Sequence, residues 1–249
     1  MADVTPVYGF PYQELGDAPD GPQLGEDLAL AVEGVITRMD TACKITVYSS
    51  GSGTWTKNVS PAPKWVEVEL WGGGASGSAA GGGAGQAAGG GGGGGAYCRK
   101  LYAATALSAT EAYAVGAGGS GNAGAGNAGV VSTFKTLTAG GGTNGLSMAT
   151  ATGNSLASNG LGGTATNGDI NRAGSDGGKG QVNAGIALFT NTGGSAPCGG
   201  GQSTFTGSVQ AVGTAGKFPG GGASGSFAGG TGQNGASGAS GCIIVREYF

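Results

Sequence analysis

The sequence predicts a mostly β and irregular chain, with an N-terminal arm, a short α-helix, a small β-sheet framework and a glycine-rich body of polyglycine-II-like helices. Three observations predict this class. Glycine supplies 61 of the 249 residues, and 54 of these glycines follow Trp71. The two most hydrophobic strand candidates, residues 64–71 and 242–249, bracket this glycine-rich part. An amphipathic stretch with helical spacing lies between residues 22 and 40.

The first element is an extended arm over residues 1–21, which glycine and proline interrupt repeatedly with turn signals. Tyr8, Phe10 and Tyr12 alternate along it, as in a segment that lays one face on a surface. We expect these three aromatic side chains to attach the chain to a partner.

The second element is a helix that begins near Pro22, where the missing N–H of proline costs nothing. A helix of about nineteen residues is marginal alone in water, so its apolar stripe must meet another surface. Two alternatives stay open: a short parallel oligomer through heptad positions, or docking onto the same chain's body or a partner. Residues 1–41 thus form an attachment arm and an oligomerisation or docking helix. The stripe consists of Leu24, Leu28, Val32, Val35, Ile36 and Met39.

The remaining residues, 42–249, form a glycine-rich β/polyglycine domain with opening strands over 42–71 and a closing strand over 242–249. In the last opening strand, alternation places Trp65, Glu67 and Glu69 on one face, with three aliphatic residues on the other. We expect the opening and closing strands to pair or to share a sheet. For residues 101–115, whose alanines also suit a helix, two strands are favoured because tyrosines and flanking glycines accompany them.

Within the body, glycine recurs at every third residue, as from Gly229 to Gly241. A period of three matches polyproline-II geometry, with a rise of about 3.1 Å per residue. Collagen would need far more than the 8 prolines present. We therefore expect left-handed glycine helices that touch along their glycine faces and hydrogen-bond backbone to backbone, with Ala, Ser, Thr and Asn projecting outward. The alternative is a flexible linker, which the recurring Leu, Val, Phe and Tyr disfavour.

The sequence predicts no enzyme, no cofactor and no metal site. The absence of histidine excludes Ser-His-Asp triads and histidine-ligated metals. The G-x-G-x-x-G match at 116–121 lacks the helix and the acidic residue of a dinucleotide site. A calcium loop opening at Asp169 has Ala173 and Gly180 where ligands are required. The four cysteines are far apart and are expected to be unpaired, small, buried hydrophobes.

The distribution of charged and apolar residues argues against two kinds of partner, nucleic acid and membranes. Lys and Arg form no basic run, so a nucleic-acid partner is not expected. No apolar run of 18 residues and no signal-like segment occurs, so membrane insertion and secretion are not expected.

An ordered set of motifs resembles the glycine-rich tail-fibre and minor tail proteins of bacteriophages. The set runs from Gly53-Thr-Trp55 through the Trp65–Trp71 strand and its following glycines to Val131-Ser-Thr-Phe134 and the closing Gly-Cys-Ile-Ile-Val-Arg-Glu-Tyr. The leader Gly9-Phe-Pro-Tyr12, with its Pro-Asp-Gly-Pro and short helix, is similar to the attachment segment of structural proteins in phages of actinobacteria.

The resemblance implies a non-enzymatic virion structural protein, a short fibre or adhesin that exposes its glycine-rich domain for attachment to the host cell surface. It would be assembled in the host cytoplasm, form a homotrimer, bind other virion proteins through residues 1–41 and contact a cell-envelope glycan. The alternative is a purely structural head-decoration or tail component without receptor binding. Residues 144–201 depart from the pattern and are the expected target-facing part. The candidate receptor-binding residues there are Asp169, Ile170, Arg172, Asp176, Lys179 and Phe189.

Overall fold

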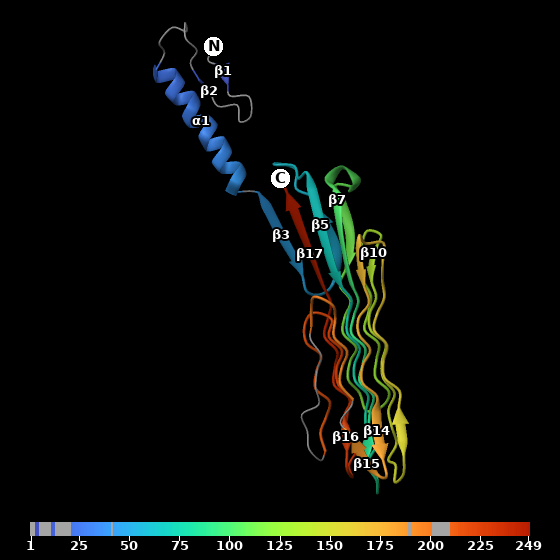
Figure 1. Ribbon diagram of the computed structural model, residues 1–249. Coiled ribbons are helices and arrows are strands. Elements are labelled where there is room, and N and C mark those ends of the chain that lie inside the picture. The colour runs from blue at the N-terminus through green and yellow to red at the C-terminus, as the bar shows by residue number, and fades with distance from the viewer. Residues whose placement is uncertain (1–2, 5–10, 13–20, 41, 189–190, 201–209) are drawn as a thin grey trace.

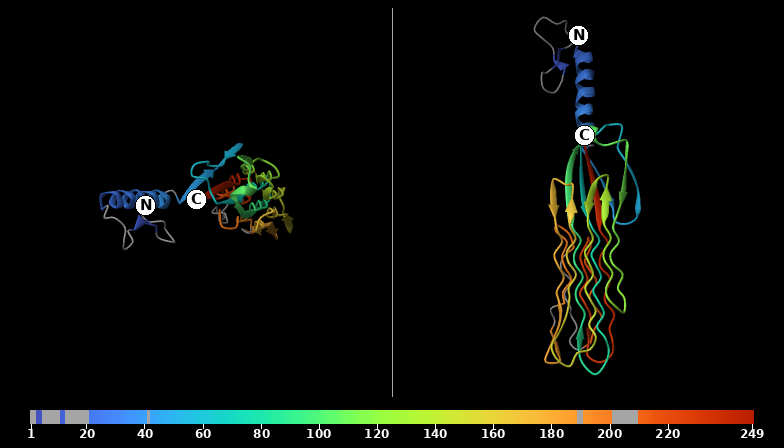
Figure 2. Two further views of the ribbon diagram at one scale, coloured as in Figure 1. Left: turned by 90° about the horizontal axis from the view of Figure 1, so that it is seen from above. Right: turned by 90° about the vertical axis from the view of Figure 1, so that its right-hand side faces the viewer.

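The computed structural model describes residues 3–4, 11–12, 21–40, 42–188, 191–200 and 210–249. These residues form a mostly β structure with one α-helix, α1 (Gly21–Asp40), and one short 3-10 turn, η1 (Ala104–Ala106). The body is elongated, and α1 lies beyond one of its ends (Figures 1 and 2). We call the end of the body nearer to α1 proximal and the opposite end distal.

The helix begins one residue before Pro22, close to where the sequence predicts it. Preceding it, two short strands, β1 (Asp3–Val4) and β2 (Pro11–Tyr12), pair antiparallel. The helix leads through residues 41–42 directly into β3 (Cys43–Tyr48).

Two five-stranded sheets make up the proximal end. The first, called the proximal sheet below, has the strand order β13-β7-β5-β17-β3, and the second has the order β12-β10-β9-β8-β4. The first sheet also contains β5 (Trp65–Trp71), β7 (Tyr97–Ala103), β13 (Ile170–Arg172) and β17 (Cys242–Tyr248). The second contains β4 (Ser52–Thr56), β8 (Thr110–Ala114), β9 (Ser132–Phe134), β10 (Leu137–Ala139) and β12 (Ala165–Thr166).

The expected pairing of the opening and closing strands is present. Strand β17 lies antiparallel beside β5, with Cys242 opposite Trp71 and Tyr248 opposite Trp65. The aliphatic face of β5 is fully buried against the second sheet, where Trp55 and Phe134 lie. The ends of the glycine-rich excursion are therefore joined by a conventional hydrophobic core.

The middle of the body is joined by backbone hydrogen bonds with a period of three. Along residues 72–80, every third N–H donates to the same neighbouring segment. One set donates to residues 90–96, the second to residues 124–130 and the third to residues 233–239, each in antiparallel direction. Successive residues therefore point to three different neighbours, whereas a β-strand points to two.

The run Gly89–Gly95 lies in the centre of this arrangement. Its N–H groups donate to three segments and its carbonyl groups accept from three others, so six segments surround it. A Cβ atom on any of these seven glycines would lie 1.9–2.4 Å from a backbone oxygen of a neighbour. None of the seven has a positive φ. These positions need glycine because there is no space for a side chain, and not because of backbone conformation. The six segments are residues 75–78, 140–146, 160–163, 175–178, 192–194 and 220–226.

The expectation that serine and alanine project outward from the body is wrong for several positions. Ser76, Ser78, Ser224 and Ser226 are fully buried. Their hydroxyl groups hydrogen-bond to backbone groups of neighbouring segments, as Ser226 Oγ does with the carbonyl of Ser78 at 3.1 Å. A small hydroxyl therefore fits between the packed segments without leaving an unsatisfied polar group.

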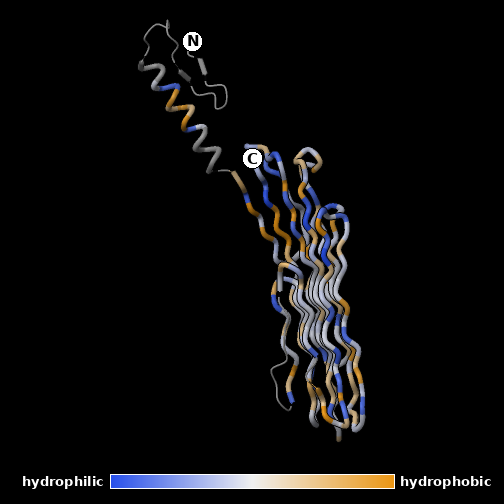
Figure 3. Tube along the Cα trace, in the orientation of Figure 1, coloured by the Kyte–Doolittle hydropathy of each residue, from blue (hydrophilic) through white to orange (hydrophobic). Residues whose placement is uncertain are grey.

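The distal end has small sheets and a second apolar core. A three-stranded sheet, called the distal sheet below, has the order β11-β14-β15, and β16 pairs with β6. Figure 1 shows β14, β15 and β16 at the end remote from α1. In Figure 3 the hydrophobic colouring is strongest in the proximal strands, while the middle of the body is nearly neutral. The strands are β6 (Ala87–Ala88), β11 (Ser155–Ala157), β14 (Gly180–Asn183), β15 (Ile186–Leu188) and β16 (Phe227–Ala228).

Candidate functional site

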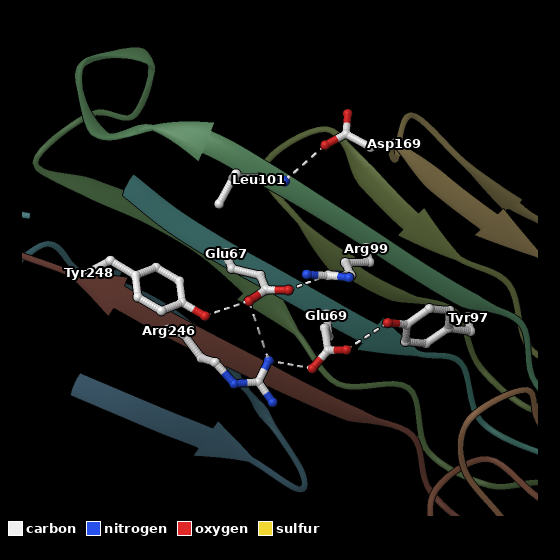
Figure 4. Close-up of polar contacts among 8 residues, drawn as sticks. All are labelled: Glu67, Glu69, Tyr97, Arg99, Leu101, Asp169, Arg246 and Tyr248. Atoms are coloured by element: carbon white, nitrogen blue, oxygen red, sulfur yellow. Dashed lines mark hydrogen bonds and ion pairs between the residues drawn. The ribbon is translucent and has the colours of Figure 1, made fainter. Parts of the chain in front are cut away.

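The candidate receptor-binding residues are spread along the body. Ile170 and Arg172 lie on β13, an edge strand of the proximal sheet. Asp169 precedes this strand, and its Oδ2 accepts a hydrogen bond from the N–H of Leu101 at 2.9 Å (Figure 4). Asp169 therefore holds the start of β13 against β7.

The other three candidates are elsewhere. Asp176 Oδ1 accepts a hydrogen bond from the N–H of Gly162 at 2.8 Å, within the glycine-rich middle. Lys179 immediately precedes β14 at the distal end. Phe189 lies outside the described residues. The structure thus does not bring the predicted receptor residues together into one site.

The predicted oligomerisation and attachment residues are only partly described. Leu28 and Val32 of α1 are 43% and 39% exposed. Tyr8 and Phe10 lie outside the described residues, as does the side chain of Tyr12. The remaining stripe residues lie on α1 with side chains outside the described part: Leu24, Val35, Ile36 and Met39.

The distal sheet has one buried face and one open face. Leu156, Gln181 and Leu188 lie directly opposite one another on β11, β14 and β15. Directly opposed residues in antiparallel strands share a face, and Asn183 opposite Ile186 belongs to the same face because it lies two residues from Gln181. The other face carries Ala157, Val182 and Ala187, which are buried in the distal core.

The open face, called the distal face below, combines apolar and amide side chains. Leu156 and Ile186 are 58% and 63% exposed. Within the described residues, the amide groups of Gln181 and Asn183 make no hydrogen bond, so they can donate and accept. A shallow hollow of about 410 Å³ lies beside them. It is lined by Asn154, Ser155, Leu156, Gln181, Val182 and Asn183.

Strands β6, β11, β14, β15 and β16 contain no Asp, Glu, Lys or Arg. The nearest charged residue along the chain is Lys179, beside β14. The distal face is therefore suited to a neutral ligand that offers hydroxyl or amide groups together with apolar surface, and not to one recognised by ion pairs.

A cluster of charged side chains lies on the outer face of the proximal sheet (Figure 4). Glu67 on β5 forms ion pairs with Arg99 on β7 and, at 3.9 Å, with Arg246 on β17. Arg246 also pairs with Glu69. Each carboxylate also accepts a hydrogen bond from a tyrosine hydroxyl: Tyr248 donates to Glu67 at 2.7 Å and Tyr97 donates to Glu69 at 2.6 Å.

The environment fixes the protonation states of this cluster. Burial by itself raises the pKa of Glu67, but the hydrogen bonds from Tyr248 and Arg99 and the two guanidinium charges outweigh it, so the pKa lies below its ordinary value. The pKa of Tyr97 is raised by burial and by its hydrogen bond to Glu69. The pKa of Tyr248 is raised by its hydrogen bond to Glu67 and by burial. Glu67 is therefore anionic near neutral pH, and both tyrosines are neutral donors.

This cluster joins three neighbouring strands at the centre of the sheet. Sequence reasoning placed Glu67 and Glu69 together on one face, but it did not identify Arg99, Arg246 or the tyrosines as their partners. The register of β5 with β7 and β17 decides these contacts. It places Arg99 opposite Glu69 and Arg246 opposite Glu67, so each guanidinium can reach diagonally to the other glutamate, two residues along β5 on the same face. The distal face was also missed, although the polar-apolar-polar alternation of Gln181, Val182 and Asn183 on β14 was a weak signal for it.

The cysteines are free, as expected, but only two are buried. Burial raises the pKa of the Cys98 thiol to about 11 and also raises that of Cys242. Cys43 and Cys198 are exposed, which differs from the expectation for small hydrophobes.

The described part of the chain contains no group of three or more His, Cys, Asp and Glu residues arranged to hold a metal ion. Among the helices of that same part, none is both long and apolar enough to cross a membrane.

A model of a protein family described as a glycine-rich domain matches residues 49–248. The match covers both proximal sheets from β4 onward, the glycine-rich middle and the distal end. Searching the curated proteins gave no match to this sequence.

Proposed function

Since the chain belongs to the glycine-rich domain family, we propose that it is a non-enzymatic structural protein of a bacteriophage virion, a short fibre or adhesin whose distal end contacts the host cell surface. The motifs shared with glycine-rich tail-fibre and minor tail proteins support the choice of a virion. The elongated body in Figure 1 supports a fibre.

The body is proposed to be a bundle of polyglycine-II-like helices. The three-residue period of the hydrogen bonds along residues 72–80 supports this assignment, since each helix has three residues per turn. Six neighbours around Gly89–Gly95 are what hexagonal packing of such helices requires. A bundle of this kind is rigid because its links are backbone hydrogen bonds from end to end.

The single observation that carries the attachment function is the distal face, which is uncharged and exposed at the end remote from α1. Its free amides, Gln181 and Asn183, can hydrogen-bond to sugar hydroxyls, while Leu156, Ile186 and Leu188 offer apolar contact to the carbon faces of a sugar ring. A neutral cell-envelope glycan is therefore the proposed ligand.

The N-terminal end, with α1, is proposed to attach the protein to the rest of the virion. Exposed Leu28 and Val32 on α1 support helix association in a homotrimer, and residues 1–41 would bind other virion proteins. A trimer would present three distal faces, which multiplies weak contacts through avidity.

The test is saturable binding of labelled full-length protein to host cells. We expect Leu156→Asp/Leu188→Asp to weaken binding at least about tenfold. The matched control is Val130→Asp/Leu161→Asp, which alters two exposed aliphatic residues of the glycine-rich middle. Both variants should keep the thermal stability of the parent, so that a loss of binding is not a loss of folding.

The alternative function is a bracing component of the head or tail without receptor binding. The same rigid backbone bundle favours it, because rigidity serves a brace as well as a fibre. Saturable binding by the parent protein would exclude this alternative, and absence of any binding to host cells would select it.

A further inference from the structure

The outer face of the proximal sheet carries a group of exposed apolar side chains. On β3, Ile45 and Val47 are 59% and 56% exposed, although they lie in a strand that is paired along its full length with β17. Trp65 on β5 and Leu101 on β7 are each 49% exposed. Pairing places all four on the same face as Glu67 and Arg246. The opposite face of this sheet is the buried proximal core.

The position of β3 makes this face unusual. Strand β3 is an edge strand, and within the described residues it pairs only with β17. Natural sheets usually protect such an edge with charged residues, proline or a bulge. The one charged side chain of β3, Lys44, lies on the other face, 3.6 Å from Glu247. The outward side chains of this six-residue edge, Cys43, Ile45 and Val47, are thus uncharged where a protective charge is normally found.

Strand β3 also follows α1 closely, and both elements expose apolar side chains. Only residues 41–42 separate the two elements. The view from above in Figure 2 shows α1 and β3 on the same side of the body. Leu28 and Val32, one helical turn apart and both exposed, thus precede the exposed Ile45 and Val47 along the chain.

The charges on this face are compatible with an identical partner. Glu67 and Glu69 are matched by Arg99 and Arg246 within the sheet. The centre of the face therefore has no net charge. Arg172, which forms no ion pair among the described residues, lies on the same face but on β13, at the edge opposite β3, so two copies can approach on the β3 side without like-charge repulsion. The aliphatic rim supplies the buried area that association requires.

We propose that a second copy of this chain covers β3 and the apolar residues Ile45, Val47, Trp65 and Leu101. The interface continues the association of α1, so the proposal rests on the oligomeric part of the proposed function, but it does not depend on host attachment. In the assembly, β3 lies toward the neighbouring copy and the distal face stays free.

The test is the solution mass of the full-length protein across a range of concentrations, measured by sedimentation velocity. Ile45→Glu/Val47→Glu should raise the dissociation constant of the oligomer at least about tenfold. The matched control, Val130→Glu/Leu161→Glu, adds the same charges at exposed positions of the glycine-rich middle and should leave the constant unchanged. An unchanged constant in the β3 variant would overturn the proposal, as would a parent protein that stays monomeric.

Cross-linking of the parent chain tests the same contact without altering β3. Cys43 opens β3 and is exposed, and so is Cys198, which follows Pro197 beside Trp71 at the end of β5. A short bismaleimide should give covalent dimers in the parent and in Cys198→Ser, but not in Cys43→Ser. Dimers that form only through Cys198 would contradict the placement of the interface.

Cell binding separates this inference from the proposed function. A monomeric parent that still binds host cells would overturn the interface and leave host attachment standing. Self-association through β3 without cell binding would support the interface and contradict attachment.

Discussion

A Cβ atom on Gly93 would lie 1.9 Å from the carbonyl oxygen of Leu161. The N–H of Gly93 donates to the carbonyl of Thr143, and its own carbonyl accepts from the N–H of Ala75. Backbone atoms of other segments thus enclose Gly93 on three sides. Because backbone cannot turn aside as a flexible side chain can, the two segments could accept a methyl group only by moving apart.

Gly93→Ala should therefore lower the free energy of unfolding by about 3 kcal/mol, at the upper end of overpacking effects. The control is Gly153→Ala, because nothing lies within 4 Å of a Cβ there and φ is not positive. That change should leave the free energy of unfolding unchanged or raise it by about 0.5 kcal/mol, because alanine reduces the conformational entropy of the unfolded chain. Thermal or urea unfolding checks both, and equal stability of the two variants would contradict the packing argument.

Ser132 is a buried hydroxyl with two partners. Its Oγ accepts a hydrogen bond from the N–H of Gly116 at 2.8 Å and donates to the carbonyl of Trp71 at 2.6 Å. Ser132→Ala leaves both groups buried without this partner, so the free energy of unfolding should fall by about 1–3 kcal/mol. Ser147→Ala, at an exposed serine, should change it by less than about 0.5 kcal/mol. Chemical unfolding of the two variants decides the comparison.

Acidification should destabilise the proximal sheet through Glu67. Folding lowers the pKa of this carboxyl below its ordinary value of 4.5, so its contribution is fully present above pH 4.5 and is lost as the pH falls through the folded-state pKa. Glu67→Gln should lower the free energy of unfolding by about 1–3 kcal/mol at neutral pH, because Arg99 and Arg246 then lack the carboxylate with which they pair. Below pH 4.5 the stability of this variant should fall less steeply than that of the parent. If the free energy of unfolding of the parent and of Glu67→Gln fell equally over this pH range, the lowered pKa of Glu67 would be contradicted.

Hydrogen exchange should reveal the enclosed centre of the body. The amides of Gly91 and Gly93 donate to Gly178 and Thr143 within a segment that six others surround. They should exchange only with global unfolding and be among the slowest in the chain. The amide of exposed Gly153 should exchange quickly. Exchange of Gly93 at the rate of Gly153 would contradict both the enclosure and the proposed polyglycine-II bundle.

Helix α1 should hold the copies of the proposed oligomer together. Leu28→Glu/Val32→Glu replaces two exposed apolar residues of α1 and should lower the solution mass of the full chain toward that of a monomer. Glu33→Gln, at an exposed polar position of the same helix, should leave the mass unchanged. Light scattering measures both variants, and an undiminished mass in the first would show that α1 does not hold the copies together, leaving docking on another protein as its role.

The sequence by itself determined the elements whose side-chain pattern is local. The spacing of Leu28 and Val32 indicated a helix, which is α1, and the alternation of Trp65, Glu67 and Glu69 indicated the faces of β5. The hydrophobic strands at the two ends of the glycine-rich part were expected to pair, and β5 and β17 do. The glycine period also indicated backbone contacts in the body, because residues without side chains can satisfy their polar groups only through the backbone.

Tertiary structure alone decided which segments meet. Glycine carries no side chain to encode a partner, so nothing in Gly89–Gly95 specifies that six particular segments surround it. The same holds for Ser76 and Ser226, which the sequence placed outside and the packing buries. The expected receptor residues, from Asp169 to Lys179, were grouped by nearness in sequence, whereas the chain passes from the proximal sheet to the distal end over that stretch. The distal face exists only because β11, β14 and β15 lie side by side, and that arrangement depends on long-range contacts that no local pattern records.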